Sequence, residues 1–174
     1  MTFLDHPILD IVNEQQAQAH KKPGQKWEAR DAYYQGVFEN TDKWQYVTFK
    51  PVEARYFCLE ALSEQKGQPY SSVAEIVLLD AQGKEIPRTN WKIVYADSEE
   101  LGGDDGDAAN VFDLQYTSFW HTEWENKAPK PPHQIVIDLG KNYDVSGMKL
   151  LPRQDGPNGR IKDYKLYFSV QPLL

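Results

Sequence analysis

The fold of this chain is constrained most by short runs of β-branched and aromatic residues, separated by Gly, Pro, Asn and Asp at intervals of roughly ten residues. These runs cover residues 45–49, 54–61, 73–79, 91–95, 118–122, 134–139, 145–151 and 162–169. In the run 134–139, Ile135, Ile137 and Leu139 fall on one face while Gln134, Val136 and Asp138 fall on the other, so one face of that strand is expected to look inward. About eight such strands predict an all-β fold, a two-sheet β-sandwich or jelly roll.

The length of 174 residues suits one ordinary domain. Residues 1–26 are polar and end near the breaker pair Pro23-Gly24, which predicts a linker or lead-in segment before a single domain over residues 27–174. The only cysteine, Cys58, is expected to be a small apolar core residue. The acidic, glycine-rich stretch 97–110 predicts a surface loop in which Glu99 and Glu100 are solvated.

Charge and hydropathy exclude some classes of partner. The net charge of -7 repels phosphate backbones and anionic headgroups, which argues against nucleic acid and against acidic membranes. The chain has no run of about 20 apolar residues, and its first residues lack the basic start and apolar stretch of a secretory signal. If the protein is exported, we expect the signal to lie outside this fragment.

Motifs of common catalytic sites are missing from the sequence. We find no nucleophile elbow, no His-Glu-x-x-His, no phosphate-binding loop and no dinucleotide-binding glycine pattern. Aromatic residues nevertheless make up 13% of the chain, a surplus that belongs either to a core or to an exposed binding surface. We therefore expect a binding protein and not an enzyme.

Three segments in the second half carry a family resemblance: Phe119-Trp-His-Thr-Glu-Trp124, Pro132-His-Gln-Ile-Val-Ile-Asp-Leu-Gly140 and Leu151-Pro-Arg-Gln-Asp-Gly-Pro-Asn-Gly159. Together with the tyrosine-rich run 161–169, they resemble the factor V/VIII type C, or discoidin-like, domain. Among such domains, the chain is most similar to the carbohydrate-binding modules of family 32. This resemblance implies a galactose-binding-domain-like sandwich.

The first half resembles the same family in a different order. Residues 47–57 and 71–79 are similar to the family's final strands, yet here they come first. Two accounts are open: a circularly permuted domain, or the tail of one module fused to the head of the next. We prefer permutation, because sandwich termini often lie close together and the chain ends soon after residue 169.

The resemblance implies a sugar site made of His121, Trp124, Arg153 and Asn158. Such a site needs an aromatic plate for the apolar face of a sugar and fixed donors and acceptors for its hydroxyls. Structural roles remain open: His121 as a hydrogen-bonded core histidine, Arg153 as the ion-pair partner of Asp155 or Asp138, and Asn158 as a turn residue before Gly159. Trp120, by contrast, is expected in the core.

The resemblance also implies a structural Ca²⁺, with Asp113, Ser118 and Glu75 at the matching positions. Hard oxygen ligands suit this cation. The family has glycine after the first aspartate, where this chain has Leu114, so the turn of that loop is in question.

The function implied is a non-catalytic module from a secreted, periplasmic or cell-surface bacterial protein. It would bind terminal galactose or N-acetylgalactosamine and target a covalently linked glycoside hydrolase or related enzyme. The alternative is a structural or protein- or lipid-interaction discoidin domain packed against a catalytic partner. A membrane-binding role is disfavoured by the acidic loop around Glu99.

Overall fold

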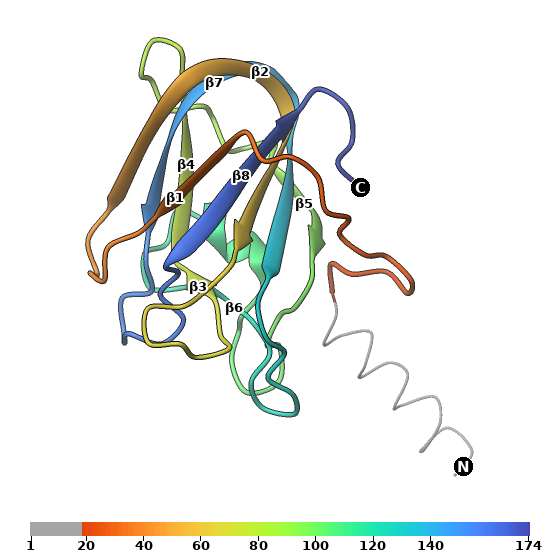
Figure 1. Cartoon of the computed structure of the whole chain (residues 1–174), viewed down its shortest axis with the longest axis vertical. Helices are drawn as coiled ribbons and strands as arrows, with labels where there is room; N and C mark the ends of the chain where they lie inside the picture. The colour runs from red at the N-terminus through yellow and green to blue at the C-terminus, as the bar shows by residue number, and fades with distance from the viewer. Residues whose placement is uncertain (1–18) are drawn as a thin grey trace.

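A computed structural model describes residues 19–174. Two long strands organise it: β2 (Gln45–Ala61) and β7 (His133–Leu151) run antiparallel along their length. Figure 1 shows both arching over the top of the molecule, so that each contributes to two layers. The pairing is irregular between Thr48 and Val52, where the strands bend. The expected all-β sandwich is confirmed.

The first layer joins the second half of β2 to the first half of β7. Strand β8 (Asp163–Ser169) pairs with residues 56–61 of β2, and β1 (Tyr34–Val37) pairs with β8 at the edge. On the other side, β5 (Lys92–Ala96) pairs with β7 at residues 135–138. The second layer joins residues 45–48 of β2, residues 145–151 of β7 and strand β4 (Glu75–Asp80).

A short two-stranded sheet, β3 (Ser72–Val73) with β6 (Trp120–His121), lies at the lower end of the sandwich in Figure 1. Between β5 and β6 the chain forms a single 3₁₀ turn, η1 (Ala108–Phe112). No helix in the described part of the chain is long and apolar enough to span a membrane.

The sequence pattern therefore locates most strands but misjudges their continuity. The runs 45–49 and 54–61 are one bent strand, as are 134–139 and 145–151. Strand β1 was not predicted, because Gly36 interrupts it; the small residue is needed there, since an added Cβ would lie 2.7 Å from the Tyr164 hydroxyl. Strands of the first half of the chain pair with strands of the second half, as a single permuted domain would require.

The main core lies between the layers and includes Ile135, Ile137, Leu139 and the fully buried Trp120, as predicted. Cys58 is also buried, as expected. The outer face of the first layer, which the alternation turns away from this core, is covered as well: Val136 is buried in a second cluster with Trp27, Tyr167 and Leu173. The residues just before the predicted domain start also touch the sandwich, because the Ala96 N–H donates to the His20 carbonyl oxygen. Residues 1–18 of the predicted linker lie outside the described residues.

Candidate functional site: a hollow beside the short sheet

A hollow of about 210 Å³ opens beside the short sheet. Its lining comprises Tyr70, Asp104, His121, Trp124, Arg153 and Asn158. The structure thus brings together all four residues expected to bind sugar, although they come from two separate segments of the chain. Tyr70 and Asp104 were not predicted.

His121 lies on β6 and is almost fully buried, with 3% of its surface exposed. Its Nδ1 atom lies 2.6 Å from the carbonyl oxygen of Thr122, and because a carbonyl can only accept, Nδ1 carries the proton. Burial of the ring, with a further contribution from the positive charge of Arg153, lowers the pKa of His121. A neutral ring protonated at Nδ1 leaves Nε2 as a hydrogen-bond acceptor. His121 can therefore make its structural hydrogen bond through Nδ1 and still line the hollow.

Trp124 is 38% exposed and is held from behind by the acidic loop. A Cβ added at Gly103 would lie 2.7 Å from Cζ2 of the indole, so this loop backbone lies directly against the ring. The Glu100 carboxylate ties the two segments together: Oε2 accepts from the N–H groups of Gly102 and Gly103, and Oε1 from those of Trp124 and Glu125.

The buried Glu100 and Glu99 correct the expectation that both are solvated, since they are only 3% and 1% exposed. Burial alone would raise the pKa of Glu100, but the four backbone N–H donors outweigh it and lower the pKa. Backbone N–H groups thus satisfy the buried Glu100 carboxylate, which the acidic sequence around it had predicted to lie at the surface.

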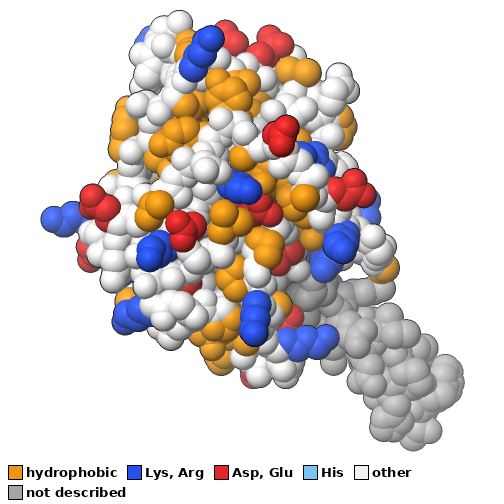
Figure 2. Space-filling view, viewed as in Figure 1, with side chains coloured by type: hydrophobic (Ala, Val, Ile, Leu, Met, Phe, Trp, Pro, Cys, Tyr) orange, Lys and Arg blue, Asp and Glu red, His pale blue; other side chains and the backbone are white. Residues whose placement is uncertain are grey.

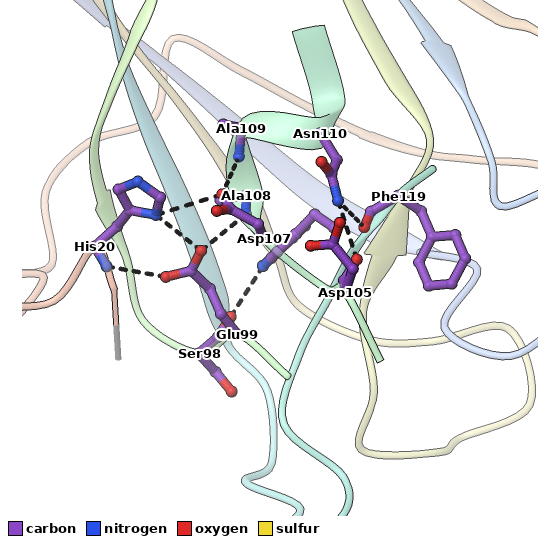
Figure 3. Close-up of polar contacts among 10 residues, drawn as sticks. His20, Ser98, Glu99, Asp105, Asp107, Ala108, Ala109, Asn110 and Phe119 are labelled. Atoms are coloured by element: carbon purple, nitrogen blue, oxygen red, sulfur yellow. Dashed lines mark hydrogen bonds and ion pairs between the residues drawn. The ribbon is translucent and has the colours of Figure 1, made fainter. Parts of the chain in front are cut away.

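Figure 3 shows how Glu99 holds the other side of the acidic loop. Its carboxylate accepts from the His20 N–H at 3.0 Å, from His20 Nδ1 at 2.8 Å and from the Ala108 N–H at 2.8 Å. The Asn110 side chain donates to the carbonyl oxygens of Asp105 and Phe119. The loop that carries Asp104 is therefore a fixed wall of the hollow.

Arg153 combines both roles that the sequence left open. Its Nε atom donates to Asp155, and its guanidinium lies 4.3 Å from the centre of the Phe119 ring. Asp138, the other partner considered, pairs instead with Arg55 at 2.9 Å. The ion pair and the ring fix the guanidinium plane at the wall of the hollow, with its terminal nitrogens as further donors.

Asn158 takes part in a turn and also lines the hollow. Its carbonyl oxygen accepts from the Ser72 hydroxyl at 2.8 Å, and Gly159 follows with a φ of 84° that favours glycine. Tyr70, also part of the lining, has its ring 5.6 Å from the His121 ring. Tyr70 was missed because only the tertiary fold brings the segment before β3 next to β6.

The three residues expected to bind Ca²⁺ lie near η1 and β4. Ser118 Oγ donates to Asp113, while the fully buried Glu75 pairs with Arg88 and keeps its Oε1 atom without a hydrogen-bond partner. Burial and the neighbouring Asp113 carboxyl raise the pKa of Glu75 to about 8. Two carboxyls close enough to share a proton, one with an unsatisfied buried oxygen, fit a hard cation. The loop keeps a left-handed backbone at the position where the family has glycine, because Leu114 adopts a φ of 64°.

One family model and several known proteins match part of this chain. The model of the F5/8 type C domain matches residues 94–172. A sialidase from Micromonospora viridifaciens is 40% identical over 86 residues, which is 49% of this chain and 13% of the sialidase. A galactose oxidase from Gibberella zeae is 39% identical over 89 residues, and an A type blood N-acetyl-alpha-D-galactosamine deacetylase from Flavonifractor plautii is 36% identical over 95 residues.

These matches cover 50% and 53% of this chain, and 12% of the oxidase and of the deacetylase. The similarity is thus confined to a small part of each of these proteins. Residues 94–172 of this chain are therefore similar to the F5/8 type C, or discoidin-like, domain.

Proposed function

We propose that this chain is a non-catalytic carbohydrate-binding module whose ligand is a terminal galactose-type sugar, galactose or N-acetylgalactosamine. The observation that supports this most is the meeting of His121, Trp124, Arg153 and Asn158 around one hollow. Trp124 offers an exposed ring for the apolar face of a sugar. Arg153 offers donors, His121 an acceptor and Asn158 both, which is the set that vicinal hydroxyls require.

The same geometry argues against chemistry in the hollow. Among the described residues that line it, Asp104 is the one carboxylate. A glycosidase needs two carboxyl groups that flank the scissile bond. The hollow suits binding of a sugar better than its hydrolysis.

We place the module in a larger secreted or surface-exposed bacterial protein, of the type of the family 32 modules, where it would hold a linked catalytic domain near its glycan. Such tethering raises the effective concentration of the substrate. The enzymes that share the segment support this context. Circular permutation is supported by the pairing of β2 and β4 with β7. Figure 2 shows lysine and arginine side chains scattered among acidic and apolar ones, with no basic patch on the face in view.

We further propose that Asp113, Ser118 and Glu75 hold a structural Ca²⁺. The unsatisfied Glu75 oxygen and its neighbour Asp113 support this site. The cation would supply charge neutralisation between the carboxylates and fix the loop that leads from η1 to β6.

The sugar proposal is tested by isothermal titration of the chain with methyl galactoside, N-acetylgalactosamine and methyl glucoside. A shallow one-sugar site should give a Kd of roughly 0.1–1 mM for the first two, equivalent to about 4–5.5 kcal/mol, and weaker binding for the glucoside. Equal affinity for all three would contradict the sugar class. No binding of any sugar would favour a structural or protein-interaction domain, and sedimentation with anionic liposomes then tests the lipid alternative.

A further inference from the structure

Asp104 is a carboxylate in the hollow that the protein itself leaves unused. Across residues 19–174, the structure gives its side chain no hydrogen-bond donor and no cationic partner. It is half-buried, and its charge acts on the neighbouring His121 ring. The carboxylate is thus available to a bound molecule.

The loop on either side of Asp104 is fixed. Glu100 accepts from the N–H of Gly103, the residue before it, at 2.9 Å. The carbonyl oxygen of Asp105, the residue after it, accepts from the Asn110 side chain at 3.0 Å. A ligand therefore meets a carboxylate on a held backbone, and little ordering of the chain is needed on binding.

The other charges in the hollow do not cancel that of Asp104. The positive charge of Arg153 is already paired with Asp155. The neutral His121 ring donates its Nδ1–H to the Thr122 carbonyl oxygen, so its Nε2 atom carries no positive charge. Glu100, behind Trp124, adds a second negative charge, although its oxygens are occupied by backbone donors. The net charge of the groups around the hollow is therefore negative.

Resting on the proposed function, we propose that Asp104 sets the charge selectivity of the site, so that a galactose-type sugar with a free amine is preferred and one with a carboxylate is rejected. An ammonium group placed near Asp104 forms a charge-assisted pair that the N-acetyl form cannot make. A sugar carboxylate bound in the hollow meets the like charge of Asp104. The site thereby distinguishes deacetylated and uncharged glycans from acidic ones.

The test titrates galactosamine, methyl galactoside and galacturonate, at about pH 6 and matched ionic strength, against the native chain, Asp104→Asn and Asp105→Asn. Asp105 is the control because it carries the same charge one residue along the loop and does not line the hollow. The native chain should bind galactosamine up to about fivefold more tightly than methyl galactoside, the range of a partly exposed ion pair, and galacturonate more weakly than either. Added salt should shrink both differences.

In Asp104→Asn the three sugars should bind with nearly equal affinity, while Asp105→Asn should keep the native order. The proposal is overturned if the native chain does not separate the three sugars, or if Asp104→Asn weakens all of them equally, which would make the carboxylate a hydroxyl acceptor. It is also overturned if both variants lose selectivity together. Failure of the proposed function looks different, since no galactose-type sugar would bind the native chain at all.

Discussion

The Trp124 backbone N–H donates to the Glu100 carboxylate at 2.8 Å, and this contact couples a buried charge to the exposed ring of the candidate sugar site. The same carboxylate holds the glycine loop that lies against the indole. The position of the ring is therefore set by a residue that does not line the hollow.

Glu100→Gln should both destabilise the fold and weaken sugar binding. An amide offers one acceptor oxygen where the carboxylate offers two, so two of the four N–H donors lose their partner. Hydrogen bonds to a charged group contribute about 1.5–3 kcal/mol each, and we expect a loss of this order in urea unfolding. Glu125→Gln, an exposed neighbour, is the control. Unchanged stability and unchanged galactoside affinity in Glu100→Gln would refute the coupling.

Gly103→Ala should weaken binding with little change in stability. The new Cβ would lie 2.7 Å and 2.8 Å from two atoms of the Trp124 ring, so the ring must move. Gly103 is exposed, and substitutions outside the core usually change stability by about 0.5 kcal/mol or less. Gly156→Ala is the matched control, because its Cβ meets nothing within 4 Å. Titration with methyl galactoside measures both variants, and equal affinities would show that the ring position is not limiting.

Ca²⁺ should raise the melting temperature of the chain, and chelation should reverse the effect. Binding to the folded state alone stabilises it by about 2.7 kcal/mol at a concentration of 100 times Kd. Asp113→Asn should abolish the shift. Asp107→Asn should keep it, which separates the proposed site from the group formed by His20, Glu99 and Asp107. A shift that survives in Asp113→Asn and disappears in Asp107→Asn would move the cation to that second group.

His133 should make stability fall as the pH rises above neutrality. Its Nδ1 atom lies 2.8 Å from Asp97 and its Nε2 atom 2.8 Å from the Pro69 carbonyl oxygen, an environment for a doubly protonated ring. Burial alone would lower the pKa of His133, but these oxygens outweigh it and the pKa is raised. A raised folded-state pKa stabilises the protein below the unfolded value of about 6.5, and this stabilisation is lost as the pH passes the folded-state pKa.

Chemical unfolding of the native chain and of His133→Gln at about pH 6 and pH 8.5 measures this effect. The free energy of unfolding should fall more between the two pH values in the native chain than in the variant, because the variant cannot release this proton. The pKa of His20 is also raised, chiefly by its hydrogen bond to Glu99, so His20 contributes a pH dependence of the same sign in both proteins. Identical pH dependence in the two proteins would mean that the His133 ring is neutral.

The sequence predicted the sandwich because strand signals are local: alternation and turn residues locate most strands without knowledge of the fold. The four sugar-site residues came from the resemblance, and their meeting in one hollow agrees with it. Asp104 could not be selected from among the acidic residues of its loop, because its place in the hollow depends on Glu100 and Asn110, which are bound across the fold. The burial of Glu99 and Glu100 was misjudged for the same reason: most of their partners are backbone groups, which carry no signal in the sequence.

Titration of methyl galactoside into the native chain, Trp124→Ala and Trp44→Ala tests most directly whether the sugar site lies in this hollow. The two tryptophans are both 38% exposed, but only Trp124 lines the hollow. We expect Trp124→Ala to lose measurable affinity, because the stacking ring contributes about 1–3 kcal/mol to a weak interaction, while its melting temperature stays close to that of the native chain. Trp44→Ala should bind as the native chain does. Full affinity in Trp124→Ala, or equal loss in both variants, would show that the sugar site does not lie in this hollow.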